Sequence, residues 1–314
     1  MSGQRKVLVV SYSQSGQLDA IAESVVAPLR DDPAIRVDWL RVAPRQPYPF
    51  PWSFLDFLDV FPEAVYLEPP PLQPFDVDAD CRYDLIILAY TVWFLAPAPP
   101  ITGFLKSETA HRLLRDTPVM TLIGCRNMWV TAQETVSRLL TEQGARLIDN
   151  AVLTDQGSAL ASFITTPRWL LTGRKDAFWG LPPAGISATD IRDARRFGEA
   201  IRAALAEPGP LQGPMLRGLG AVTVNPALVR SERIGHRSFR LWGRLLRRLG
   251  GPGTRLRRSV LILYVVFLVA MIVSVVPLQL VLQRLTAPLR RTRDAQLRAR
   301  LEAPSGSGRE RLPT

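Results

Sequence analysis

Cysteine and histidine are scarce in this chain of 314 residues, which contains only Cys81, Cys125, His111 and His236 of these two types. None of them pairs at the spacing of a zinc site or a disulfide framework, so we expect no metal site and no stapled fold. With only two histidines, the chain has few candidates for the general base of Ser-His-Asp or Cys-His catalysis. The sequence lacks the Walker pattern and GxGxxG as well, which argues against ATP and against a Rossmann NAD site.

Acidic residues are few in the C-terminal third. Residues 211–314 contain 19 of the 39 basic residues but only 4 of the 28 acidic ones, so this third has a net charge of +15 and residues 1–210 have −4. The basicity therefore belongs to one part of the chain, which divides it into two physically different regions. No leader-like apolar segment precedes the strand pattern that starts at Val7, so we expect the first region to stay in the cytoplasm.

Short apolar runs alternate with helical patterns in the first region. Buried strands are predicted at residues 7–10, 35–42, 83–90, 118–123 and 146–153. Helices are predicted at 18–30, 52–61, from 101, at 130–143 and at 191–206. This alternation predicts an α/β domain over residues 1–206 with a doubly wound five-stranded parallel sheet. Insertions rich in proline, aromatic and apolar residues at 44–75 and 154–187 are expected to form an apolar lid over a substrate.

Three strand ends carry unusual loops, at residues 11–17, 91–100 and 124–129, and we expect them to meet at one edge of the sheet. The first loop offers hydroxyls from Ser11, Ser13 and Ser15, close backbone approach at Gly16 and an amide at Gln17. A loop of hydroxyls without a cation suits the terminal phosphate of a mononucleotide such as FMN. The alternative is turn and N-cap chemistry without a ligand.

The other two loops offer a wall and polar groups for a flat ring. Trp93 and Phe94 follow a strand almost directly, and the alternative is that both belong to the core. Arg126 and Asn127 bring polar groups to the same rim, where they can contact the pyrimidine edge of a flavin or an oxyanion of substrate. Cys125 is expected to be simply buried.

The C-terminal region has the composition of a membrane-associated segment. Within a basic linker at 207–258, residues 237–249 place apolar side chains on one helical face and arginines on the other, as in an interfacial helix. Residues 259–282 carry no charge and would be about 36 Å long as a helix, enough to span a bilayer. The alternatives are a re-entrant turn and a buried core helix. Anionic lipids, rather than nucleic acid, are the expected partner of the arginines.

Arginines flank the uncharged run on both sides, so the positive-inside rule gives no orientation. With the first domain in the cytoplasm, the basic tail at 283–314 is either translocated or, after a re-entrant turn, returned to the cytoplasm. Its end is expected to be disordered. The protein is therefore expected at the cytoplasmic face of the inner membrane, anchored by a C-terminal helix.

The segments VVSYSQSGQ, DLIILAYTVWFLAPAPPITGFL and VMTLIGCRNMW, in this order, resemble the flavodoxin-like superfamily of FMN-dependent NAD(P)H oxidoreductases over roughly residues 5–206. The resemblance implies a flavodoxin-like fold, FMN as cofactor and NAD(P)H as a further one. It implies FMN contacts by residues of the three loops: Ser11, Ser13, Gln14, Ser15, Gly16, Gln17, Thr91, Val92, Trp93, Phe94, Gly124, Arg126 and Asn127. Leu18 departs from this pattern, because the phosphate loop of the family commonly ends in threonine.

More narrowly, SYSQSGQLDAI, PYPFPWSFLDFLDVFPEAV and the hydrophobic C-terminal segment resemble the dialkylresorcinol condensing enzyme family, whose relatives act as aromatases beside a ketosynthase. This implies an FMN-dependent oxidoreductase for a hydrophobic cyclic ketone, with a ketosynthase or acyl carrier protein as partner and a homodimer as a candidate assembly. Arg126, Tyr90 and Arg168 are candidates to stabilise an enolate or phenolate. The alternatives are a membrane-anchored NAD(P)H:quinone reductase, a flavodoxin-type electron carrier and a flavin-free membrane-tethered scaffold.

Overall fold

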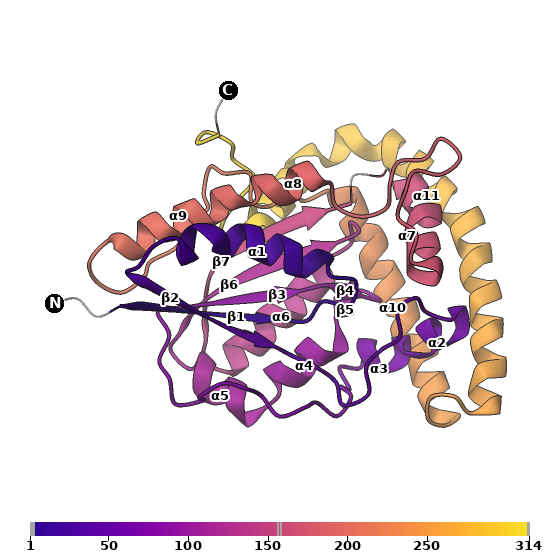
Figure 1. The fold of residues 1–314 in the computed structure, drawn as a ribbon. Helices are drawn as coiled ribbons and strands as arrows, with labels where there is room; N and C mark the ends of the chain where they lie inside the picture. The colour runs from indigo at the N-terminus through magenta and orange to yellow at the C-terminus, as the bar shows by residue number, and fades with distance from the viewer. Residues whose placement is uncertain (1–3, 156, 158, 313–314) are drawn as a thin grey trace.

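A five-stranded parallel sheet forms the centre of the molecule (Figure 1). The computed structural model describes residues 4–155, 157 and 159–312, and the side chains of 159–160 and 275–289 lie outside this description. The strands are β1 (Arg5–Ser11), β2 (Ile35–Arg41), β3 (Leu85–Tyr90), β6 (Pro118–Cys125) and β7 (Arg146–Thr154). Their order, β2-β1-β3-β6-β7, is that of flavodoxin-like doubly wound sheets, which confirms the predicted fold class.

Helices cover both faces of the sheet (Figure 1). One face carries α1 (Gln17–Arg30), α8 (Ala188–Asp193) and α9 (Arg195–Ala206), and the other carries α4 (Pro99–Leu105), α5 (Glu108–Leu114) and α6 (Val130–Glu142). The chain moves in one direction across the sheet from β1 to β2 and in the opposite direction from β3 to β6. Because both crossovers are right-handed, the helices that connect these strands must lie on opposite faces of the sheet. The strands are therefore shielded from water on both sides, and all six residues of β3 are buried.

A tight hairpin follows β3 and shapes the second predicted loop. It consists of β4 (Val92–Trp93) and β5 (Ala96–Pro97), which pair antiparallel. Phe94 and Leu95 close it with φ values of +50° and +65°, the conformation of a type I′ turn, in which Asn and Gly are the favoured residues. Two bulky residues at positive φ are strained, so the surrounding structure must hold this turn in place.

The proline-rich insertion folds into two short helices that bind the C-terminal helices. These are α2 (Phe54–Asp59) and α3 (Phe61–Val65), and they contact α10 (Pro226–Arg248) and α11 (Arg255–Glu302). The ring of Phe61 lies 5.4 Å from that of Phe239 on α10 and 4.9 Å from that of Tyr264 on α11. The insertion, predicted only as a lid, is therefore also the platform on which the helix pair packs.

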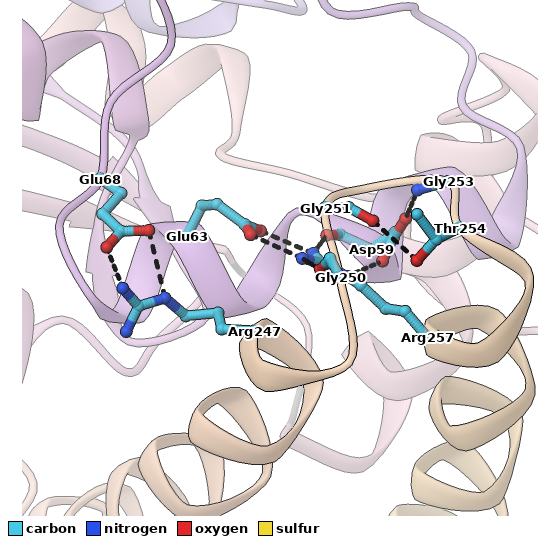
Figure 2. A network of polar contacts seen from close by, with 9 residues as sticks. All are labelled: Asp59, Glu63, Glu68, Arg247, Gly250, Gly251, Gly253, Thr254 and Arg257. Carbon is cyan, nitrogen blue, oxygen red and sulfur yellow. Dashed lines mark hydrogen bonds and ion pairs between the residues drawn. The ribbon is translucent and has the colours of Figure 1, made fainter.

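A buried ion network fixes the start of α11 to this platform (Figure 2). Arg257 is fully buried and donates to a carboxylate oxygen of Asp59 at 2.6 Å and to both carboxylate oxygens of Glu63 at 2.7 Å. The backbone N–H of Gly253, in the turn between α10 and α11, donates to the other carboxylate oxygen of Asp59 at 2.6 Å. Both carboxylates and the guanidinium thus have partners, as buried charges require.

The far end of α11 returns to the same domain, which differs from the expectation of a disordered tail. After running beside α10, the helix bends over toward β7 (Figure 1). Glu302 accepts from the backbone N–H of Val224 at 2.9 Å, and the buried Ser305 hydroxyl donates to Asp149 of β7 at 2.6 Å. Residues 306–311 then pair with 218–222 through backbone hydrogen bonds. The tail is therefore bound to the sheet domain rather than free of it.

The segment before α10, predicted as a linker, also belongs to the sheet domain. The side chains of Leu216 and Val222 are fully buried in the main core. The backbone N–H of Val152 in β7 donates to the carbonyl of Ala221 at 2.9 Å. The first domain therefore does not end at residue 206, because its last strand is covered by residues 211–224 and by the tail.

We predict that Arg257→Met lowers the free energy of unfolding by about 3–5 kcal/mol, because it leaves two carboxylates without their cation. Arg258→Met is the matched control, since Arg258 pairs with Asp56 and both side chains are about half exposed. The control should lose less than about 1 kcal/mol. Urea unfolding in a mild detergent measures both, and equal losses would contradict the importance of the buried network.

Candidate functional site

The three predicted loops meet at one cavity of about 180 Å³ at the carboxyl edge of the sheet. This confirms their expected convergence. The lining residues from these loops are Gln14, Ser15, Gln17, Thr91, Val92, Trp93, Gly124, Cys125 and Arg126. Doubly wound sheets bind ligands at this edge, so the cavity is the candidate site.

The loop after β1 presents donors without partners. Gly16 precedes α1 with a φ of +78°, a conformation that favours glycine, and no side chain caps the helix. The Ser13 hydroxyl is buried without a hydrogen-bond partner. Uncapped N–H groups at a helix N-terminus and a free hydroxyl form a surface suited to an anion. Ser13 itself faces a neighbouring hollow of about 270 Å³, which adjoins the cavity at Gln14.

Ser11 has another role than the predicted one. It is buried, and its hydroxyl accepts from the indole N–H of Trp39 at 2.8 Å and donates to Asp19 at 3.4 Å. Its hydroxyl is therefore already used to join β1, β2 and α1. Gln17 lines the cavity, and its amide N–H donates to the carbonyl of Ile186 at 3.5 Å.

Leu18, the one departure from the family pattern, is a core residue. Its side chain is 1% exposed, and a Cβ added at Gly124 would lie 3.3 Å from it. The first and third loops thus touch through an apolar contact at the floor of the cavity. A threonine at position 18 would place a hydroxyl there.

Trp93 and Phe94 lie on opposite sides of the hairpin. Trp93 lines the cavity and contacts an aromatic group that includes Tyr48 at 5.1 Å and Trp52 at 5.9 Å between ring centroids. Phe94 does not line it, because its positive φ turns its ring toward Phe57 at 4.8 Å and Phe239 at 5.8 Å. Of these two residues, Trp93 is therefore the one that can serve as a wall for a ring in the cavity.

Arg126 brings a half-buried cation to the cavity. Its Nε donates to the hydroxyl of Ser162 at 2.6 Å, and its guanidinium lies 4.0 Å from the ring centroid of Phe163. Burial lowers the pKa of Arg126 to about 10, although the nearby carboxylate of Asp155 opposes this shift. The guanidinium remains charged at neutral pH in an apolar setting, where it interacts strongly with an anion.

Tyr90 and Asn127 are not among the residues that line this cavity, and Tyr90 has another partner, while the contact of Asn127 with FMN stays a prediction. Tyr90 is fully buried, and its hydroxyl donates to the amide oxygen of Gln133 on α6 at 2.6 Å. Burial raises its pKa well above the usual range, so it stays a neutral phenol. Side chains alternate along a strand, so Tyr90 faces α6 while Thr91 reaches the cavity. Arg168 donates instead to Asp176 at 2.9 Å at the surface.

Both insertions supply lining residues that the loop analysis missed: Phe50, Phe57, Asp155, Thr166, Trp169, Leu170 and Gly185. The helix α7 (Ala159–Thr172) carries three of them. The N–H of Trp52 donates to the carbonyl of Leu170 at 2.9 Å, which joins the two insertions. Asp155 follows β7 directly, so the strand-end rule applied to a fourth strand would have found it.

Comparisons with known proteins give structural likeness only. No family model and no curated protein matches the chain. A flavoprotein in complex with FMN from Lactobacillus acidophilus NCFM matches with 18% identity over 48% of this chain and 93% of that one, at a TM-score of 0.37. A flavodoxin from the domain Archaea (13% identity, 64% and 99%, TM-score 0.34) and oxidised Flavodoxin 1 from Bacillus cereus (13%, 62% and 95%, 0.33) are similar in the same way. The fold assignment rests on strand order.

Cys125 should be unreactive in the folded protein. Burial raises its pKa far above the usual range of a thiol, and the nearby Glu232 and Asp155 add to the shift. Both cysteines are half-buried, and Cys125 lines the cavity, which differs from the expectation that Cys125 is simply buried. Because alkylation requires the thiolate, we predict from the raised pKa that iodoacetamide modifies Cys125 at least about tenfold more slowly than Cys81 at pH 8. Mass spectrometry of timed digests measures both rates. Equal rates without denaturant would contradict the raised pKa, and denaturant should equalise them.

Proposed function

We propose that this protein binds FMN and catalyses a two-electron redox reaction of an apolar cyclic ketone or quinone-like compound. The observation that supports this proposal is the convergence of the loops after β1, β3 and β6 on one cavity at the carboxyl edge of a doubly wound sheet. Bound FMN would supply hydride transfer at its ring, a chemistry that the lining side chains do not offer.

The unpaired polar groups around the cavity fit a polar ligand. The Ser13 hydroxyl, the Trp52 indole N–H and the Thr166 hydroxyl are buried without hydrogen-bond partners, and Thr166 lines the cavity itself. A buried polar group without a partner is unfavourable by about 1–3 kcal/mol, so a ligand that satisfies these groups gains this energy. Ser13 and the uncapped start of α1 would hold the phosphate, and Trp93 would face the ring.

The volume of the cavity supports a movement of the lid on binding. At about 180 Å³ it is smaller than the roughly 300–1,000 Å³ of ordinary small-molecule sites, and the hollow at Ser13 adds about 270 Å³ at the phosphate end. Trp169 and Phe50 lie over the cavity, with ring centroids 6.3 Å apart in an edge-to-face contact between the two insertions. We propose that α7 shifts away from the insertion at 44–75 when the flavin ring enters.

The covering side chains favour an apolar substrate with an oxygen that becomes negative. Phe50, Phe57 and Leu170 offer apolar contact, which contributes about 25 cal/mol per Å² buried. Arg126 is the charged donor placed to hold an enolate or phenolate oxygen. Arg126 would therefore orient the substrate and stabilise the developing charge.

The narrower proposal is an aromatising dehydrogenation. A dialkylcyclohexanedione would lose a hydride to FMN and a proton to solvent and become a dialkylresorcinol, and an external electron acceptor would reoxidise the flavin. The support is the resemblance of residues 11–21 and 47–65 to that family, together with the apolar lid. A ketosynthase or acyl carrier protein would then supply the substrate. Turnover of quinones with NAD(P)H would favour a quinone reductase instead, and flavin reduction without a small substrate would favour an electron carrier.

Ser13→Ala tests the cofactor. The hydroxyl has no partner in the protein, so its removal should leave the fold intact and weaken FMN binding by about 1.5–3 kcal/mol, or roughly 10- to 150-fold. Ser24→Ala on α1, the helix that follows the loop of Ser13, is the control, because its hydroxyl donates to the carbonyl of Arg192, away from the cavity. Titration of FMN by flavin fluorescence measures both. No saturable binding by the unaltered protein would reject FMN and favour the flavin-free scaffold.

Trp169→Ala tests the lid. Removal of this indole enlarges the cavity, so we predict that FMN associates at least about tenfold faster than with the unaltered protein, a change of about 1.4 kcal/mol in the barrier. Trp179→Ala provides a matched control, since Trp179 belongs to the same insertion but is 87% exposed. Stopped-flow fluorescence measures association. Equal rates for the two variants would mean that Trp169 does not limit entry.

A further inference from the structure

The helices α10 and α11 expose an apolar surface that is unusual for a water-soluble protein. Ten of the large apolar side chains exposed in the described part of the chain lie on them: Ile234, Leu241, Leu245, Leu256, Ile262, Leu263, Val266, Phe267, Val269 and Val273. The stretch Arg255–Ser274 has a mean hydropathy of 2.3, and only 17% of its most apolar window is buried. This excludes a buried core helix, the bland alternative for this segment, and marks an interaction surface.

Arginines border this surface. The exposed arginines of α10 and of the first turn of α11 are Arg233, Arg237, Arg240, Arg244, Arg248, Arg255 and Arg258. Apolar side chains flanked by arginines match the boundary of an anionic bilayer, where the apolar groups enter the acyl region and the guanidinium groups bind phosphates. A protein partner would not require so many cations at the rim of an apolar face.

Both ends of α11 are held by the same domain. Near its start, Arg257 is buried against Asp59 and Glu63, and its last residue, Glu302, accepts from the N–H of Val224. Just beyond, Ser305 is bound to Asp149 of β7. A helix that crosses a bilayer brings its ends to opposite faces, about 30 Å apart, so crossing would break one of these buried attachments.

We infer that α10 and the first part of α11 lie in one leaflet of an anionic phospholipid bilayer, and that α11 does not cross it. The exposed apolar side chains enter the leaflet, the bordering arginines bind lipid phosphates, and the tail stays on the side of the sheet domain. The inference does not depend on FMN, since it rests on the C-terminal helices alone. The sequence leaves open whether the tail is translocated or returned to the cytoplasm, and the inference selects the tail that returns to the cytoplasm.

Vesicle binding tests the surface. The full chain should cosediment with vesicles of phosphatidylglycerol and phosphatidylcholine more strongly than with phosphatidylcholine alone. Leu263→Asp with Val266→Asp, at side chains 59% and 62% exposed, should reduce the partition coefficient at least about tenfold. Ile164→Asp, at a side chain 51% exposed outside this surface, should leave it unchanged. Equal binding by all three proteins would overturn the inference, as would a loss of self-association without a change in lipid binding.

Cysteine labelling tests the topology. In a Cys81→Ser, Cys125→Ser background, Gly251→Cys reports the turn before α11 and Ala303→Cys reports its end, and both positions are exposed. In inside-out vesicles from a bacterium that expresses the full chain, a membrane-impermeant maleimide should label both positions before detergent is added. Labelling of Ala303→Cys only after detergent would show a spanning helix and overturn the inference. Recovery of the chain in the soluble fraction would also overturn it.

Discussion

The ion network of Arg257 with Asp59 and Glu63 is the contact on which the arrangement of the molecule depends. It joins a carboxylate pair in the proline-rich insertion to the first turn of a helix almost two hundred residues later in the chain. Removal of one partner leaves a buried charge, which is far more unfavourable than loss of a surface pair. The network therefore fixes where α11 begins. A helix with so much exposed apolar surface would otherwise have little to determine its position on the domain.

The same platform connects the helix pair to the cavity. Phe57 lines the cavity and contacts Phe94 at 4.8 Å, and Phe94 contacts Phe239 of α10 at 5.8 Å. The hairpin that places Phe94 in this chain of rings also places Trp93 in the cavity. Its two positive φ values are strained, so it depends on the packing of α2 and α10 around it. The geometry of the candidate site and the docking of the C-terminal helices are thus supported by the same residues.

The sheet and the convergence of its loops could be predicted because buried parallel strands are continuous apolar runs, and their carboxyl ends share one edge. The directions in which individual side chains point could not be predicted from the sequence. Tyr90 ends β3 and was a candidate to stabilise an enolate or phenolate, but the alternation of the strand turns it to Gln133. Phe94 follows Trp93 directly, and only the type I′ turn separates their directions. The sequence gives no sign of positive φ values at Phe94 and Leu95, because bulky residues rarely adopt them.

The C-terminal region was misjudged for a related reason. Net charge and small residues suggested a disordered end, yet residues 305–311 bind the sheet domain beside β7 through hydrogen bonds. The hydroxyl of Ser305 donates to Asp149 there, and the carbonyls of Gly306 and Gly308 accept from the backbone N–H groups of Val222 and Gly220. Because α11 is attached at both ends, its position relative to the sheet is constrained twice. Any displacement of its apolar part must therefore act on the insertion that carries Asp59, and through Phe57 on the wall of the cavity.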